Sequence, residues 1–394
     1  MTTIESVGSE KFDEDFLEEL RTHGDPQADA AISTFFDDEL HAPAEGLMNS
    51  MIRHHPNSDE ASPALSAFLN EPVELPDWYD DKLFAAGQEL FAEYLPQFGL
   101  ALWMASIPAG YAGARDVVVL ARTHELLSHP KRRFLETGQF VLDVMTPGAL
   151  EPGSKGLNDI RHVRLMHAAV RHMLTHEADE LGIAAWDART GVPINQEALL
   201  ATMFTFSMVG IQSVDKFGIH LTDEEKEAYT HAWSVIGSLM GVRGDLLPLS
   251  YADSATVWEA IKDHEYDDSL EGQELTAAAI EVMQNLIPGR FINGLPASGL
   301  QFLLGRDTAK MLGVGRPNWT YALFVPMHAF GDLSHRFQND FAPGRWVTQR
   351  LGRRMMKSFI EGEWDDERLP RTVKRGGKIA FEIPQQINRG LGLE

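Results

Sequence analysis

Val163-Arg164-Leu165-Met166-His167-Ala168-Ala169-Val170-Arg171-His172 is a stretch with the residue spacing of a packed helix that also carries chemistry. Arg164, His167 and Arg171 stand at i, i+3 and i+7 in this stretch. Because an α-helix turns once every 3.6 residues, all three side chains project from one side of the predicted helix. That side presents one neutral ring nitrogen between two cations.

The apolar neighbours of His167 indicate where its ring points. Val163, Val170 and Leu174 share its stripe along the helix, which predicts that the imidazole faces an apolar interior. Such a pocket suits haem, with the imidazole on the iron and the two arginines paired with the propionates. A hydrogen-bonded core histidine has the same spacing, so the residue types alone leave both interpretations open.

Helical periodicity dominates the rest of the chain. Alternation with β-branched residues appears only in fragments, at residues 116–120 and 378–383. Asn195 is a predicted N-cap, and Thr222-Asp223-Glu224-Glu225 reads as a capping box. We therefore predict an all-α fold with helices at residues 13–22, 26–38, 62–70, 77–97, 130–145, 157–176, 196–217, 223–240, 254–264, 270–286, 299–312, 317–330 and 343–361.

The amino-acid composition limits the chemistry of the chain. None of the 394 residues is cysteine, which excludes disulfides, cysteine-ligated iron–sulfur clusters, thiolate-ligated haem and cysteine nucleophiles. The chain contains 15 histidines, so histidine is the nitrogen ligand in good supply. A hydrophobic content of 44% is enough for a substantial core.

Negative charge is concentrated at the N-terminal end. Residues 1–81 contain 20 acidic and 3 basic side chains, whereas the remainder contains 38 acidic and 31 basic ones. The net charge of −24 argues against nucleic acid or an anionic membrane as a partner. An acidic arm of this kind is typical of a solvated surface.

We divide the chain into an acidic, partly helical N-terminal extension (residues 1–81), one central domain (residues 82–362) and a C-terminal tail (residues 363–394). The first residues lack the basic and apolar regions of a leader peptide, so we expect a cytoplasmic protein. The longest uncharged run, residues 94–114, is interrupted by prolines and glycines and predicts a buried helix and turn, with no membrane span. The oligomeric state is not indicated.

Motif spacing excludes several competing sites. His124 and His129 are five residues apart, about 140° around a helix, unlike the zincin pair. His172 and His176 have the i, i+4 spacing but no third ligand is apparent, which favours a surface pair. No histidine belongs to a Glu-x-x-His pair, the pattern of carboxylate-bridged di-iron sites. The sequence also lacks the glycine-rich loops of nucleotide-binding sites and the Gly-x-Ser-x-Gly elbow of serine hydrolases.

A second polar cluster lies in the helix predicted from Pro130. Arg133 and Thr137 share a face with Val141 on the predicted helix. Glu136 directly precedes Thr137 and lies on the neighbouring face. In a buried pocket, the arginine and threonine would orient a ligand bound to iron, and the carboxylate would act as a general base. An ion pair between Arg133 and Glu136 on a solvated helix explains the same spacing.

These residues resemble the latex-clearing protein (rubber oxygenase) and MpaB oxygenase family. The likeness spans residues 95–340 and is carried by residues 133–137, by residues 163–172, and by residues 191–197 continuing to residues 241–248. It implies a single-domain, all-α, globin-like helical bundle around a haem pocket, which makes residues 82–362 a haem-binding oxygenase catalytic domain. Rubber-cleaving members bind haem b without a covalent link and use O2 to cleave carbon–carbon double bonds in isoprenoid chains.

Matched residue by residue, the resemblance assigns roles to five positions. His167 falls on the proximal iron ligand, and Arg164 and Arg171 fall on arginines beside it. Arg133 and Thr137 fall on polar residues of the distal pocket. The resemblance therefore implies haem b as the cofactor, with His167 on the iron.

Glu136 departs from the family pattern, because rubber-cleaving members carry lysine at this position and are also secreted. We therefore expect O2-dependent cleavage of a small hydrophobic alkene, isoprenoid or otherwise lipid-like, with Glu136 as the base for an allylic proton. Haem-dependent peroxidase, hydroxylase or dehydrogenase chemistry is the enzymatic alternative. A haem sensor or a carrier of an apolar ligand is the non-enzymatic one.

Overall fold

The computed structural model describes residues 11–38, 63–122, 130–176, 178, 185–247, 249–286 and 292–324. Within these ranges the chain forms helices and no strand, which confirms the all-α prediction; one isolated bridge joins Gly113 and Tyr266. The helices, in chain order, are α1 (Glu14–Leu20), α2 (Pro26–Asp38), α4 (Pro63–Leu69), α5 (Asp81–Glu93), α6 (Leu95–Ala101), the π-helix η2 (Leu102–Ser106), α7 (Ile107–Tyr111), α8 (Val117–Arg122), α10 (Pro130–Val144), α11 (Lys155–His176), the 3-10 helix η3 (Ala188–Thr190), α12 (Gln196–Lys216), α13 (Asp223–Leu239), the 3-10 helix η4 (Gly244–Leu246), α14 (Tyr251–Glu265), α15 (Leu270–Leu286), α16 (Leu295–Leu304), α17 (Arg306–Met311) and the 3-10 helix η6 (Trp319–Leu323).

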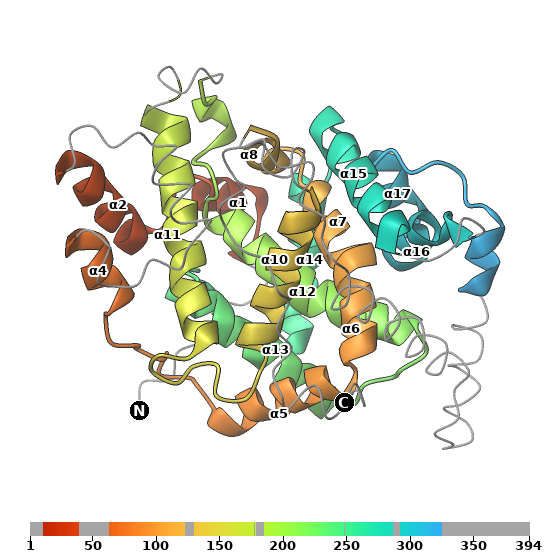
Figure 1. Ribbon diagram of the computed structural model, residues 1–394, viewed down its shortest axis with the longest axis horizontal. Helices are drawn as coiled ribbons and strands as arrows, with labels where there is room; N and C mark the ends of the chain where they lie inside the picture. The colour runs from red at the N-terminus through yellow and green to blue at the C-terminus, as the bar shows by residue number, and fades with distance from the viewer. Residues whose placement is uncertain are drawn as a thin grey trace.

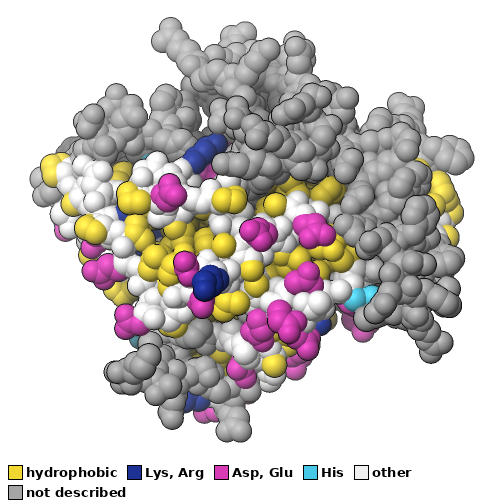
Figure 2. Space-filling model, turned by 90° about the horizontal axis from the view of Figure 1, so that it is seen from below, with side chains coloured by type: hydrophobic (Ala, Val, Ile, Leu, Met, Phe, Trp, Pro, Cys, Tyr) yellow, Lys and Arg dark blue, Asp and Glu magenta, His cyan; other side chains and the backbone are white. Residues whose placement is uncertain are grey.

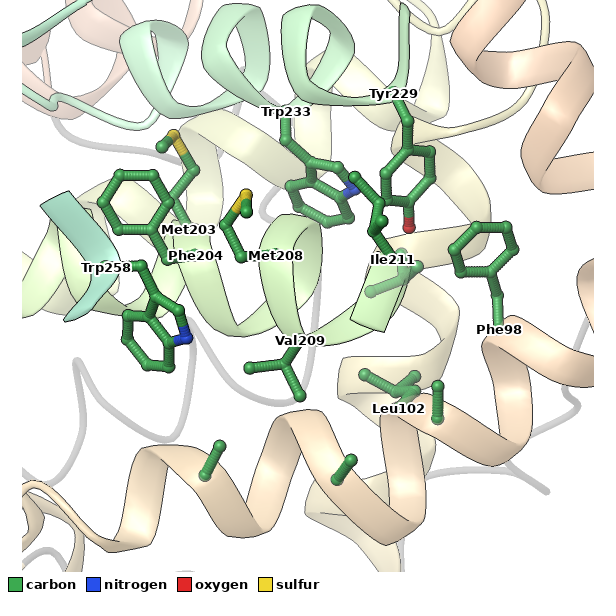
Figure 3. Close-up of a cluster of buried hydrophobic side chains, with 14 of the residues drawn as sticks. Phe98, Leu102, Met203, Phe204, Met208, Val209, Ile211, Tyr229, Trp233 and Trp258 are labelled. Atoms are coloured by element: carbon green, nitrogen blue, oxygen red, sulfur yellow. The ribbon is translucent and has the colours of Figure 1, made fainter. Parts of the chain in front are cut away.

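The main core surrounds α12, which is buried along most of its length. Phe204 and Met208 of this helix have no solvent-exposed surface, and the ring of Phe204 lies 6.1 Å from that of Trp258 in α14. Figure 3 shows these side chains with Trp233 of α13 and Phe98 of α6, so four helices meet around one apolar cluster. Burial of such large side chains, at about 25 cal/mol per Å2, is the main stabilising contribution to the fold.

Among the described helices, α12 alone is long and apolar enough to cross a membrane. However, 78% of its most apolar window is buried inside the protein, as expected for a core helix. Asn195 caps its first turn by accepting a hydrogen bond from the amide of Ala198, which confirms the predicted N-cap. The composition of α12 is therefore explained by packing.

Helix α11 lies between two groups of helices (Figure 1). On one side α10 packs against it, and on the other side α2 and α4 do. Leu165, Ala168 and Ala169 of α11 share a small buried cluster with apolar residues of α2 and α4, including Ile32 and Phe68. The N-terminal helices therefore cover a face of α11 that would otherwise expose apolar surface.

The expectation of a solvated acidic arm is wrong for residues 11–38. Leu17, Leu20 and Ile32 anchor α1 and α2 by their buried side chains, and Arg21 and Asp25 are only 1% and 2% exposed. Composition averages over both faces of these helices, so it hides the few charged groups that point inward. Most carboxylates of these residues, among them Glu14, Asp15 and Glu18, are exposed. Figure 2 shows the molecule from below the view of Figure 1, and on this face too Asp and Glu side chains outnumber Lys and Arg.

Some predicted elements differ from the structure in their ends or type. The helix predicted at residues 77–97 is two helices separated at Tyr94, and the one predicted at residues 299–312 breaks at Gly305, whose φ of +88° suits glycine. Residues 116–120, with a strand-like pattern, lie at the start of α8. The run at residues 94–114 is buried and helical, as predicted, except that residues 102–106 form the π-helix η2.

The capping box at Thr222 and Glu225 is confirmed by the hydrogen bonds in both directions between them. The helix predicted at residues 317–330 begins as η6, and the structure describes it only as far as Phe324. The helix predicted at residues 343–361 and the C-terminal tail at residues 363–394 lie outside the described residues.

Candidate functional site

Helix α11 carries His167 beside an apolar surface. Val170 and Leu174 are buried, as the sequence predicts, in a cluster with Val119 of α8. Val163 and His167 are half-buried, and the Nδ1 atom of His167 is shielded from solvent. The ring of His167 therefore lies at the edge of the predicted apolar stripe.

The two arginines of α11 bind carboxylates of the N-terminal segment. Arg164 donates to Asp25 through Nε at 2.5 Å and Nη2 at 2.9 Å, in a bidentate pair. Arg171 donates from Nε to Asp29 at 2.7 Å and from Nη1 to the carbonyl of Ile194 at 2.9 Å. Burial raises the pKa of Asp29, against the effect of Arg171, which lowers it.

Arg171 has one more donor to offer. Its side chain is 5% exposed, and its buried Nη2 has no hydrogen-bond partner among the described residues. A buried donor without a partner is unfavourable by about 1–3 kcal/mol, so Nη2 is suited to an anionic group that the structure does not contain. The assignment of Arg164 and Arg171 to haem propionates stays a prediction, because both side chains already hold carboxylates of the protein.

Glu136 and Thr137 lie on α10, the helix that packs against α11. Both side chains are half-buried, which differs from a fully solvated surface position. The backbone of Arg133 belongs to the same helix, but its side chain is outside the described part of the structure. The structure thus brings together the two helices that carry the predicted proximal and distal residues.

A buried carboxyl pair joins the end of α10 to the start of α11. Asp143 accepts hydrogen bonds from Gln139 at 2.8 and 2.9 Å and lies 3.3 Å from Lys155. Burial, together with a hydrogen bond to Asp143, raises the pKa of Asp159 to about 8. Burial therefore favours the protonated form of Asp159, in which its carboxyl group can donate a hydrogen bond to Asp143 across the two helices.

Arg21, at the end of α1, lies in a second buried charged cluster that the sequence did not indicate. Its Nη1 contacts Glu197 of α12 at 3.1 Å and Glu265 of α14, and its Nη2 lies 3.1 Å from Asp116. Glu197 and Glu265 are 0% and 3% exposed. One guanidinium from the N-terminal segment therefore meets carboxylates from three separate parts of the chain.

The carboxyl groups of this cluster outnumber the guanidinium groups that contact them, and burial shifts their pKa values. Burial raises the pKa of Glu197 to about 7 and, together with Asp116 and Glu197, raises that of Glu265 to about 9. Burial acts to lower the pKa of Arg21, but the surrounding carboxylates raise it above its ordinary value. Burial therefore favours the protonated form of Glu265 in particular.

Glu197, His264 and Glu265 also bring their oxygen and nitrogen atoms within 4.8 Å of one another, a spacing compatible with a metal ion. His264 Nδ1 lies 2.6 Å from Glu197, and Arg115 lies 2.8 Å from Glu265. Because the guanidinium of Arg21 already contacts both glutamates, the cluster has its own cation. We therefore interpret it as a structural ion cluster.

Other histidines have structural contacts. His172 stacks on Phe36 and on His176, with ring centroids 4.2 and 4.8 Å apart, which fits the predicted surface pair. His231 accepts a hydrogen bond from the amide of Asp80, at the N-cap of α5, so its contact is structural.

Comparisons with known proteins place this helical arrangement in a family. The family model described as "ER-bound oxygenase mpaB/B'/Rubber oxygenase, catalytic domain" matches residues 86–333. A rubber oxygenase from Streptomyces sp. (strain K30) is 23% identical over 310 residues, which cover 74% of this chain and 71% of that protein. A solved structure of latex clearing protein LCP in the closed state has a TM-score of 0.61 and 19% identity, covering 92% of this chain and 94% of that one.

The structural likeness shows the shared fold, and the match of the family model shows the family. The matched residues contain both α10 and α11, and they begin inside α5, after the N-terminal helices. The resemblance first seen in three segments is thereby confirmed over more than half of the chain. This chain belongs to the catalytic-domain family of the MpaB and rubber oxygenases.

Proposed function

We propose that this protein is a haem b-dependent oxygenase that cleaves a carbon–carbon double bond of a small hydrophobic alkene with O2. The observation that carries the proposal is the oxygenase family match over residues 86–333, which includes the half-buried His167 on α11. A cytoplasmic location, an isoprenoid or other lipid-like substrate, and the absence of a nucleic-acid partner belong to the same proposal.

The residues of α11 fit haem in two respects. His167 supplies an imidazole beside buried Val170 and Leu174, and such a side chain would hold the iron of a bound haem next to an apolar surface. Arg171 supplies a buried Nη2 donor for an anionic substituent. A bound haem would supply the iron that activates O2.

Glu136 and Thr137 would act from the facing helix α10. The Thr137 hydroxyl would donate a hydrogen bond to the oxidant, and a Glu136 carboxylate oxygen would accept an allylic proton from the substrate. Because an alkene and O2 together give two carbonyl fragments with no proton left over, Glu136 would return that proton during the same turnover. We propose that Arg133 adds a second donor.

Haem content tests the cofactor. We expect purified protein to show a Soret band and near-equimolar haem b in a pyridine haemochrome assay, and His167→Ala to lose most of it. His176→Ala is the matched control, because His176 is exposed on the same helix and should leave haem content unchanged. A wild-type protein that stays colourless and takes up no added haem would contradict the proposal.

Product analysis tests the reaction. With 18O2 and a small isoprenoid alkene, we expect two carbonyl fragments that each carry one labelled oxygen atom. Glu136→Gln should lower kcat with little change in haem content, because an amide cannot accept the allylic proton. An intact substrate that has gained one oxygen, or lost two hydrogens, would favour hydroxylase or dehydrogenase chemistry instead. Stable ligand binding without turnover would favour a haem sensor or carrier.

A further inference from the structure

Residues 24–29, which we call the strap, comprise the end of the connection between α1 and α2 and the first turn of α2, and they lie along α11. Two ion pairs join the strap to the helix, Asp25 with Arg164 and Asp29 with Arg171. The two arginines are seven residues apart, so they lie on the same side of α11, two turns apart. The strap therefore contacts α11 on both sides of the position of His167 along the helix axis.

The space around both ion pairs depends on glycine. A Cβ on Gly24 would lie 2.7 Å from Asp29 Oδ2 and 3.0 Å from Arg171 Nε. A Cβ on Gly241, whose φ is +91°, would overlap Asp25 Oδ2 and lie 2.9 Å from Arg164 Nε. Each ion pair is thus packed closely against a glycine, at a position where a larger residue would have no room for its Cβ.

Backbone contacts fix the strap to the rest of the protein. The carbonyl of Gly24 accepts a hydrogen bond from Gln196 Nε2 at 2.7 Å, and the same Nε2 donates to the carbonyl of Gly241 at 3.0 Å. Just before the strap, the carbonyl of His23 accepts from the amide of Gln196 at 2.9 Å. Gln196, in the first turn of α12, therefore joins the strap to the same segment that packs against Asp25.

We propose that Asp25 and Asp29 are positioning residues for His167, holding α11 in register with α12 through Arg164 and Arg171. The ion pairs set the axial position and rotation of α11, and the rotation sets the direction of the His167 ring. The positioning of α11 follows from the ion pairs of the strap alone. The expected effect on haem binding also rests on the proposed haem function. The strap precedes residues 86–333, which the family model matches, and in this proposal it holds the helix that carries His167.

The experiment compares Asp25→Asn and Asp29→Asn with Asp37→Asn, a matched control on the exposed face of α2. In haem-loaded protein, the rate of haem transfer to an acceptor apoprotein and the Soret maximum are measured at a temperature where all variants remain folded. We expect haem to leave between about tenfold and about hundredfold faster from both strap variants, with a shifted Soret maximum. The control should match wild type.

A second measurement needs no haem. Hydrogen exchange of the apoprotein should become faster in α11 around residue 167 in both strap variants, and not in Asp37→Asn. Unchanged exchange in α11 together with unchanged haem release would overturn the proposal. Faster exchange of residues 24–29 on haem binding would also overturn it, because the propionates would then have displaced the two aspartates.

Failure of the proposed function has a different signature. If wild type binds no haem, the cofactor assignment is wrong, and the exchange measurement alone decides whether the strap positions α11. If Asp25→Asn does not fold, Asp25→Glu, which retains the charge but moves the carboxylate, takes its place, and we expect its haem release to be faster than that of wild type and slower than that of Asp29→Asn.

Discussion

The N-terminal segment meets the body of the protein in two regions that balance charge in different ways. Along α11, Asp25 and Asp29 meet Arg164 and Arg171 one to one, with no need for a shared proton. Around Arg21, the buried Glu197 and Glu265 contact one buried guanidinium, and burial raises the pKa of both carboxyl groups and so favours their protonated forms. The ion pairs of the first region fix the position of α11. The raised pKa values in the second region make the packing of α1 against the body of the protein depend on pH.

Removing the cation of the second region should have the largest effect on stability. Arg21→Met leaves Glu197 and Glu265 buried without the guanidinium that contacts both. We expect the free energy of unfolding in urea to fall by about 3–5 kcal/mol at pH 7, as is typical when one partner of a buried ion pair is removed.

The matched control for this change is Arg189→Met. Arg189 forms an ion pair with Asp187 as well, but its side chain is 90% exposed. We expect its loss to leave the free energy of unfolding nearly unchanged, because solvent screens an exposed ion pair. If the two variants behaved alike, the Arg21 cluster would not be the attachment point of α1.

A methyl group added beside the first region should have the next largest effect. Gly241→Ala must hold a φ near +91° and places its Cβ against the Asp25–Arg164 pair. We expect a loss of between about 1 and about 3 kcal/mol in the free energy of unfolding. Gly244→Ala is the control, since a Cβ there has no neighbour within 4 Å. Equal losses would show that the ion pair has room to move.

The structure also shows which parts of the fold the sequence can predict. Helices α2 and α15 have the predicted bounds, because proline, apolar spacing and helix ends are local signals. The separation of α5 from α6 at Tyr94 was not predicted. Its apolar periodicity continues through the break, but Pro96, in the first turn of α6, is a local signal for a helix start that the prediction of one continuous helix overlooked.

The sequence also predicts one part of the candidate site and misses another, because the first is local in the chain and the second is not. His167 and its apolar neighbours lie within three turns of one helix, so their spacing shows that they belong together. Arg21 meets Glu197 and Glu265 across 176 and 244 residues of chain. An arginine in an acidic arm carries no local sign of such partners, and Glu197 in the first turn of α12 reads as an ordinary helix-dipole contact.

The second region should also make stability depend on pH. The pKa of Glu265 is raised to about 9 by burial, whereas in an unfolded chain it lies near 4.5, so the folded state holds the proton more tightly. The contribution of this group is therefore fully present below pH 4.5 and is lost as pH rises towards 9. The upper limit for one proton is about 1.4 kcal/mol per pH unit.

Glu265→Gln, which mimics the protonated acid, isolates this effect. We expect the free energy of unfolding of the variant, measured relative to wild type, to increase from pH 5 to pH 9. Glu281→Gln, at an exposed position of α15, should follow wild type at every pH. A difference between Glu265→Gln and wild type that stayed constant over this range would mean that Glu265 ionises normally.

The smallest effect separates charge pairing from ordinary hydrogen bonding along α11. Arg164 Nη2 donates to Gln27 Oε1 at 2.9 Å as well as to Asp25, but Gln27 is exposed and neutral. We expect Gln27→Ala to change the free energy of unfolding by less than about 0.5 kcal/mol and to leave the exchange of α11 unchanged. If it loosened α11 as much as Asp25→Asn does, the strap would act through its general packing, and the two carboxylates would lose their separate role.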